Sequence, residues 1–292
     1  MKITLSGSLG NTGKPLTKIL VEAGHDVTVI SSQSDRKTAI EALGAKAAIG
    51  SVSDPNFLTK AFEGADAVYA MTPPNMGGSK ILSNMKQAGE AYATAFNNAG
   101  VKRVVMLSSV GAHLPSGNGP IAGVHAIEQT YNKLEGLAVT YLRAGYFYFN
   151  FYNSIPMIKQ AGILGSNFPA STSMALVHPY DIAAAAAEEL QKSGEGKNVR
   201  YIVSDIRTAG EVARVLGAAF GNKNLPWIEF TDEQAEQGII QAGLPEEIGK
   251  LYAEMGRGLG SGKIQEDFEA QGALVTGQIK LEDFARDFAA RF

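Results

Sequence analysis

The sequence contains no cysteine among its 292 residues. This absence excludes disulfides, thiolate nucleophiles and cysteine-ligated zinc or iron–sulfur centres. Clusters of His, Asp and Glu with metal-ligand spacing are lacking too, so we expect no metal site. The lack of cysteine is compatible with a cytoplasmic protein, which is the location we expect.

Excess charge of one sign and long apolar runs are also missing. Lys and Arg number 26 against 29 Asp and Glu, and basic runs are absent, so direct nucleic-acid binding is not expected. Apolar runs stay short of the ~20 residues that cross a bilayer. The N-terminal segment lacks the charged lead and apolar stretch of a signal peptide. We therefore expect no membrane association.

An alternation of short β-branched runs and helical patterns fills the first half of the chain, which is typical of parallel βαβ units. The predicted strands are residues 3–6, 26–31, 45–50, 67–71, 103–107 and 139–142. The predicted helices are residues 12–23, 36–43, 53–62, 79–99 and 122–134. Later segments are predicted as a polar loop at 162–173, a helix at 181–192 and a strand at 199–203. From residue 205 onward we expect helices and one short strand near 227–230.

This order predicts an α/β fold: a doubly wound parallel-sheet Rossmann domain with a smaller, mostly helical C-terminal substrate region. The domain is assigned to residues 1–152 and 174–204, and the smaller region to residues 153–173 and 205–292. A ligand is expected in the crevice at the carboxyl ends of the strands.

A glycine loop of the form G-x-x-G-x-x-G follows the first predicted strand and opens the first helix. Glycines permit a tight turn and let the backbone approach a pyrophosphate, while the helix N-terminus presents N–H groups and positive partial charge to it. A plain glycine turn that packs a helix on a strand is the alternative. We predict a dinucleotide bound by Gly7, Ser8, Leu9, Gly10, Asn11, Thr12 and Gly13.

The end of the second strand indicates which dinucleotide is bound. NAD-binding proteins usually carry an acid there for the ribose 2′-hydroxyl, whereas this chain has Ser32, followed by Arg36. Arg36 could accommodate a 2′-phosphate, or it could simply belong to a solvated helical turn. We therefore favour NADP over NAD.

Five further motifs carry a family resemblance. They are GSVSD at residues 50–54, LSSVGA at 107–112, TYLRAGYF at 140–147, VHPYDIA at 177–183 and GQIKLEDFA at 277–285. Together with the glycine loop they resemble the NmrA-like, atypical short-chain dehydrogenase/reductase family, above all its quinone oxidoreductase and triphenylmethane reductase branch. The resemblance implies an NAD(P)H-dependent oxidoreductase that transfers hydride to a quinone-like or aromatic electrophilic acceptor.

The acid–base pair of the larger superfamily is missing. That pair is a tyrosine with a lysine four residues on, which lowers the tyrosine pKa. No tyrosine here has such a lysine, and Tyr131, on the expected helix, is followed by Glu135. A sugar-nucleotide epimerase or dehydratase is therefore disfavoured. A non-enzymatic NAD(P)(H)-sensing regulator that binds a protein partner stays open, as does a homodimer.

Two residues are candidate catalytic groups. By resemblance His125 occupies a position near the nicotinamide ribose, where it either donates a proton or only orients the cofactor. Ser108 ends the fifth strand and is expected to face the nicotinamide. Further cofactor contacts are predicted for Ser51, Val52, Met71, Thr72, Pro73, Tyr146 and Phe147.

The remaining candidates receive weaker roles. About half of the aromatic run at residues 146–149 is expected to line a pocket. His113 and His178 are predicted as surface or loop residues. Residues 256–263 superficially suggest a P-loop but lack its spacing, and they are predicted as a flexible loop.

Overall fold

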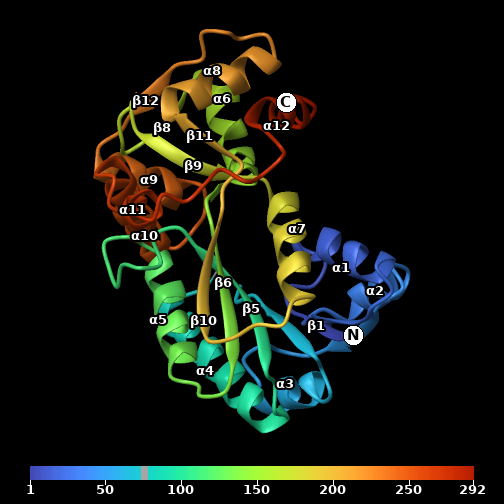
Figure 1. The fold of residues 1–292 in the computed structure, drawn as a ribbon. Helices are drawn as coiled ribbons and strands as arrows, with labels where there is room; N and C mark the ends of the chain where they lie inside the picture. Colours follow the sequence, from blue (N-terminus) through green and yellow to red (C-terminus); the bar gives the residue numbers. More distant parts are fainter. Residues whose placement is uncertain (74–77) are drawn as a thin grey trace.

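The computed structural model describes residues 1–73 and 78–292 (Figure 1). A parallel sheet of seven strands dominates it, in the order β10-β6-β5-β4-β1-β2-β3. Its strands are β1 (Lys2–Leu5), β2 (Asp26–Ser31), β3 (Lys46–Ile49), β4 (Ala67–Ala70), β5 (Arg103–Ser109), β6 (Ala138–Ala144) and β10 (Lys197–Ile202). The chain leaves β3 at one edge and re-enters beside β1, so the topological switch point lies between β1 and β4. This is the predicted Rossmann-type order.

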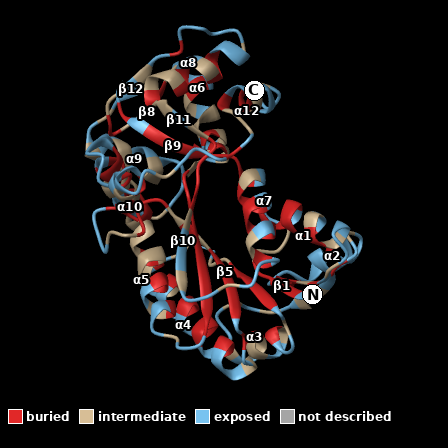
Figure 2. Cartoon of the chain, in the orientation of Figure 1, coloured by how far each residue is buried: buried red, intermediate tan, exposed pale blue. Residues whose placement is uncertain are grey.

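Helices cover both faces of the sheet (Figure 1). One face packs against α1 (Gly13–Glu22), α2 (Lys37–Glu41) and α7 (Pro179–Leu190). The other packs against α3 (Pro55–Phe62), α4 (Ile81–Ala99) and α5 (Ile121–Asn132). The central strands and the inner faces of the helices are buried, whereas the edge strands β3 and β10 are partly exposed (Figure 2). The Rossmann domain predicted from the alternation of elements is therefore confirmed.

Local signals explain where these helices begin and end. Asp54 caps α3, because its carboxylate accepts hydrogen bonds from the N–H groups of Asn56 and Phe57, at 2.9 and 3.2 Å. Gly100 ends α4 in the left-handed region, at φ 68°, where glycine is favoured. A short 3-10 turn, η1 (Ser34–Arg36), precedes α2.

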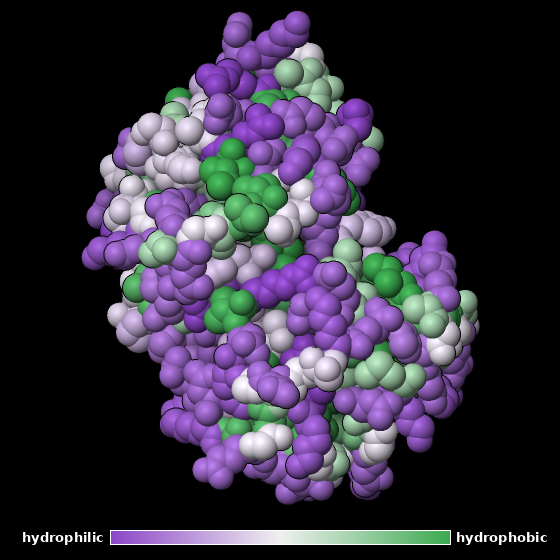
Figure 3. Space-filling model, in the orientation of Figure 1, coloured by the Kyte–Doolittle hydropathy of each residue, from purple (hydrophilic) through white to green (hydrophobic). Residues whose placement is uncertain are grey.

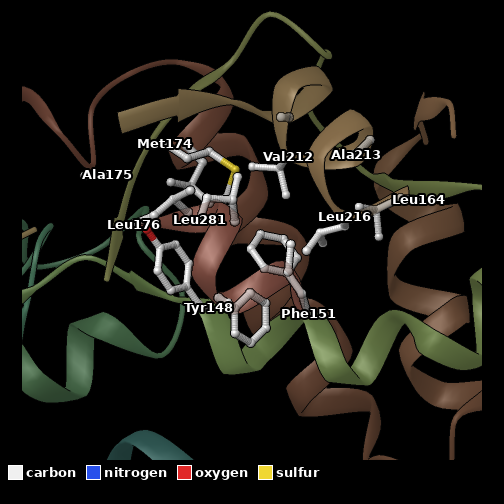
Figure 4. Close-up of a cluster of buried hydrophobic side chains, with 14 of the residues drawn as sticks. Tyr148, Phe151, Leu164, Met174, Ala175, Leu176, Val212, Ala213, Leu216 and Leu281 are labelled. Carbon is white, nitrogen blue, oxygen red and sulfur yellow. The ribbon is translucent and has the colours of Figure 1, made fainter. Parts of the chain in front are cut away.

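The smaller region lies beyond the carboxyl ends of the central strands (Figure 1). It contains the helices η2 (Tyr148–Ser154), α6 (Ile155–Ala161), α8 (Ala209–Ala219), α9 (Asp232–Gln241), α10 (Glu246–Gly260), α11 (Glu266–Ala270) and α12 (Leu281–Ala289). Two small sheets accompany them, one of β7 (Tyr146–Phe147), β9 (Ser173–Val177) and β11 (Asp205–Thr208), the other of β8 (Leu164–Ser166) and β12 (Trp227–Glu229). Tyr148, Phe151 and Leu281 are among the residues that fill its core (Figure 4).

Three sequence predictions in this part of the chain are wrong. Residues 162–173 are not all loop, because β8 forms there and pairs with β12, and β11 adds an unpredicted strand. Residues 256–260 form the last turn of α10 rather than a flexible loop. Gly256 packs so closely on Asn167 that a Cβ would lie 1.8 Å from its Oδ1. His178 lies in the loop between β9 and α7, which is one of its two predicted places, but it is buried, and its Nδ1 accepts the N–H of Tyr180 at the start of α7.

Candidate functional site

The ends of β1 and β4 are joined at the switch point by the Ser6 hydroxyl. Its Oγ donates to the carbonyls of Tyr69 and Met71, at 3.1 and 3.2 Å, and accepts the N–H of Met71 at 2.8 Å. Tyr92, from α4, donates to the same Met71 carbonyl at 3.1 Å. The two strand ends that flank the crevice are therefore held at a fixed separation.

The glycine loop that follows β1 requires glycine at two positions. Gly7 has φ 98° and faces Met71, whose Cε would lie 2.5 Å from a Cβ. At Gly13 a Cβ would lie 2.2 Å from the Ser8 carbonyl oxygen. The Gly10 N–H closes the turn on the Gly7 carbonyl at 3.2 Å. The loop therefore folds back tightly on itself, and its backbone is open to close approach by a ligand.

The N-terminus of α1 points into this loop without a side-chain cap. Thr12 occupies the N-cap position but makes no capping hydrogen bond. An uncapped helix start carries N–H groups and a positive partial charge, which suit a pyrophosphate. The loop's close backbone packing and the uncapped helix thus both fit the phosphates of a dinucleotide.

A cleft of about 550 Å³ lies on one side of the loop, beside the ends of β2 and β3; we call it the loop cleft. The predicted cofactor residues that line it are Gly7, Ser8, Ser32, Ser51, Val52, Met71 and Pro73. Pro74, which follows them, lies outside the described residues. The Ser8 hydroxyl donates to Ser31 Oγ at 3.0 Å, which ties the loop to the end of β2. Sequence reasoning missed Asn84, Gln87 and Ala88 of α4, which also line this cleft.

A cavity of about 460 Å³ lies on the other side, at the ends of β4, β5 and β6; we call it the central cavity. The predicted residues that line it are Asn11, Thr12, Met71, Thr72, Ser108, Tyr146 and Phe147. Met71 lines both spaces, so the loop cleft and the central cavity are neighbours on either side of it. Both lie at the carboxyl edge of the sheet beside the glycine loop, and we call the pair the trough.

The smaller region supplies the far wall of the central cavity. Tyr252, Met255 and Leu259 of α10 line it, followed by Ile264 and Gln265. The i, i+3, i+7 spacing of the first three places them on one face of α10, a face that the sequence analysis missed because it predicted residues 256–263 as a flexible loop. Figure 3 shows apolar side chains gathered in the middle of one face, where the two regions meet, amid hydrophilic surroundings.

Ser108 is held from behind the cavity by a buried ionic network. Its hydroxyl donates to Glu128 at 2.5 Å, and Arg143 contacts both carboxylate oxygens of Glu128, at 2.7 and 3.1 Å. Arg143 also bonds Asp267 of α11 at 2.7 Å, and Asp267 accepts from the Tyr201 hydroxyl. Because the Ser108 hydroxyl already donates its proton in the hydrogen bond to the Glu128 carboxylate, this serine offers the cavity a lone pair rather than a proton. Ser108 lines the central cavity, and its expected position facing the nicotinamide and its catalytic role both stay predictions.

Five predicted residues lie outside the walls of both spaces. His125 is half-buried, and its Nδ1 contacts the Ala112 carbonyl at 2.7 Å. It is absent from the cavity lining, so its proton-donor role stays a prediction. Arg36 is exposed, and its Nε donates to Gln33 at 3.2 Å, just beyond β2. Leu9, Gly10 and Gly13 support the loop without lining either space.

The aromatic run divides as expected. Tyr146 and Phe147 line the central cavity, whereas Tyr148 and Phe149 pack into the core of the smaller region. Tyr131 is fully buried among aromatic side chains, and burial raises the pKa of its hydroxyl well above the ordinary value. It therefore cannot replace the missing acid–base tyrosine.

Over residues 1–73 and 78–292, no three His, Asp or Glu side chains are placed to hold a metal ion. No helix in those residues is long and apolar enough to cross a membrane.

Comparison with known proteins agrees with this geometry. A family model described as NAD(P)H-binding matches residues 7–192. An NAD(P)H azoreductase of Xenophilus azovorans is 27% identical over 255 residues, which cover 87% of this chain and 85% of that protein.

Two solved structures share the whole fold. An NADPH-dependent quinone oxidoreductase of Escherichia coli, crystallised with NADPH, superposes with a TM-score of 0.80 at 19% identity, covering 98% of this chain and 99% of that one. A triphenylmethane reductase of Citrobacter sp. superposes with a TM-score of 0.76 at 19% identity, covering 100% of both chains. The family resemblance predicted from the motifs is confirmed.

Proposed function

Because the chain belongs to the NAD(P)H-binding family, we propose that it is an NAD(P)H-dependent reductase of quinone-like or aromatic electrophilic acceptors. The observation that carries the proposal is the trough formed by the loop cleft and the central cavity. Its glycine loop fits a pyrophosphate, and its central cavity, walled by Tyr146, Phe147 and Tyr252, fits a flat aromatic ring. The azoreductase, quinone oxidoreductase and triphenylmethane reductase relatives support this class of acceptor.

The adenosine half of the cofactor is assigned to the loop cleft, and the nicotinamide to the central cavity beside Ser108 and Thr72. NADP is preferred over NAD in this proposal. Ser32, which lines the loop cleft, is not an acid and so would not repel a phosphate on the ribose 2′ position. Arg36 follows Ser32 by four residues and is proposed to pair with that 2′-phosphate.

NAD(P)H held in the trough would supply a hydride, which carries two electrons, and a quinone-like acceptor would take up one further proton, which water can provide. Ser108, fixed by Glu128, and Tyr146 would position the rings, and residues 153–173 and 205–292 are proposed to bind the acceptor through α10. No tyrosine–lysine pair is needed, because such acceptors delocalise the charge that hydride brings.

A steady-state assay of NADPH oxidation tests the proposal. The protein is offered a naphthoquinone, an azo dye and a triphenylmethane dye, with NADPH affinity measured in parallel by fluorescence. We expect saturable turnover of at least one acceptor. Tight NADPH binding without turnover of any acceptor would instead favour the non-enzymatic sensor.

A further inference from the structure

Every described side chain that lines the central cavity is uncharged. The wall contributed by α10 shows how this arises. Tyr252, Met255 and Leu259 face the cavity, whereas the charged residues between them turn away. Glu254 accepts the N–H of Gly117, and Arg257 pairs with an aspartate of α9 at 2.6 Å.

The polar groups of the wall are also kept neutral or already satisfied. Burial raises the pKa values of the Tyr146 and Tyr252 hydroxyls, so both stay protonated and act only as hydrogen-bonding groups. Gln265 accepts the N–H of Ala175 and donates to the Ser173 carbonyl at 3.0 Å. No charge therefore arises from the wall near neutral pH.

The charged side chains behind the wall form ion pairs with one another. Glu128, behind Ser108, is 2% exposed and is held by two nitrogens of Arg143. Arg143 in turn pairs with Asp267. Neither sign of charge is left to serve as a counter-ion for a ligand in the cavity.

We propose that the acceptor is an uncharged, flat ring system, and that the cavity discriminates against acceptors that carry an ionised group on the reacting ring. The inference rests on the proposed function, whose acceptor class it narrows. A sulfonate, phosphate or quaternary ammonium entering with the ring would lose its water and find no counter-charge, which is costly. Cationic dyes and phosphate esters are therefore poor acceptors for this chain.

Three 1,4-naphthoquinones with 2-substituents of similar bulk test the charge rule: the uncharged 2-(2,2-dimethylpropyl) compound, the 2-sulfonate and the 2-(trimethylammonio)methyl derivative. Since the substituents also change the reduction potential, affinity is measured by calorimetry beside kcat/KM, for the protein loaded with 1,4,5,6-tetrahydro-NADP, whose nicotinamide ring is uncharged and donates no hydride. We expect the neutral quinone to bind about 100-fold more tightly than either ion.

Two variants extend the test. Met255→Lys places a positive charge at the cavity wall and should raise the affinity for the sulfonate, relative to the neutral quinone, about tenfold. Leu274→Lys adds the same charge at an exposed position, 75% accessible and outside the cavity lining, and should leave that ratio unchanged. If Met255→Lys fails to fold, the comparison of the three quinones on the unaltered protein decides alone.

The outcomes separate the two proposals. Binding of all three quinones within threefold, or of none, overturns the inference. Preferential binding of the neutral quinone without NADPH oxidation leaves the inference standing and refutes the reductase function instead.

Discussion

Substitution of Gly13 by alanine tests the glycine loop directly. The new Cβ would lie 2.2 Å from the Ser8 carbonyl oxygen, a contact that side-chain rotation cannot relieve because the obstacle is backbone. The loop must therefore shift by roughly 1 Å, enough to break hydrogen bonds to a bound phosphate. One charge-assisted hydrogen bond contributes about 2 kcal/mol. Its loss raises the Kd for NADPH about 30-fold.

Fluorescence titration of NADPH into Gly13→Ala measures this effect, with thermal unfolding as the test of folding. The matched control is Gly238→Ala in α9, where a Cβ would have no neighbour within 4 Å. Alanine there should leave the Kd unchanged and favour the helix by up to about 1 kcal/mol. A folded Gly13→Ala protein that binds NADPH within twofold of the original would refute the assignment of this loop to the pyrophosphate.

Three further substitutions test other parts of the account. Arg36→Ala should weaken NADPH binding about tenfold and leave NADH unaffected; an unchanged affinity ratio would remove Arg36 from the 2′-phosphate site. Glu128→Gln removes one of the two carboxylates that pair with the buried Arg143 and should lower the free energy of unfolding by about 3 kcal/mol in urea titrations; a loss under about 1 kcal/mol would argue against a tightly coupled network. Burial lowers the pKa of His178, so the unfolded chain binds this proton first and stability should fall as pH drops below about 6.5. This decline in stability with falling pH should be smaller in the His178→Asn variant. A pH profile of stability identical to that of the unaltered protein would contradict this role of His178.

The Rossmann part of the fold could be predicted because its signals are local. Strand–loop–helix alternation, the cap at Asp54 and the glycine before each strand are all read within a few residues. The smaller region could not be predicted to the same depth. Strands β8 and β11 are held by partners distant along the chain, and Gly256, which resembled a loop glycine, is required by the close approach of Asn167.

The candidate site likewise has one part that could be predicted from the sequence and one part that could not. The glycine loop could be predicted from its own spacing, and its geometry explains why Gly7 and Gly13 carry no side chain. The network behind Ser108 could not, since Glu128 and Arg143 meet only when α5 is laid against β6. Their charges, taken singly, are indistinguishable in sequence from those of solvated residues.

A crystal structure with NADP⁺ and an uncharged naphthoquinone tests the central claim most directly, namely that one trough holds both the hydride donor and the acceptor. The account predicts the adenosine half in the loop cleft and the nicotinamide beside Ser108. The quinone ring should stack over the nicotinamide, against Tyr146 or Tyr252, within about 3.5 Å. A dinucleotide bound elsewhere, or a quinone outside the central cavity, would contradict it.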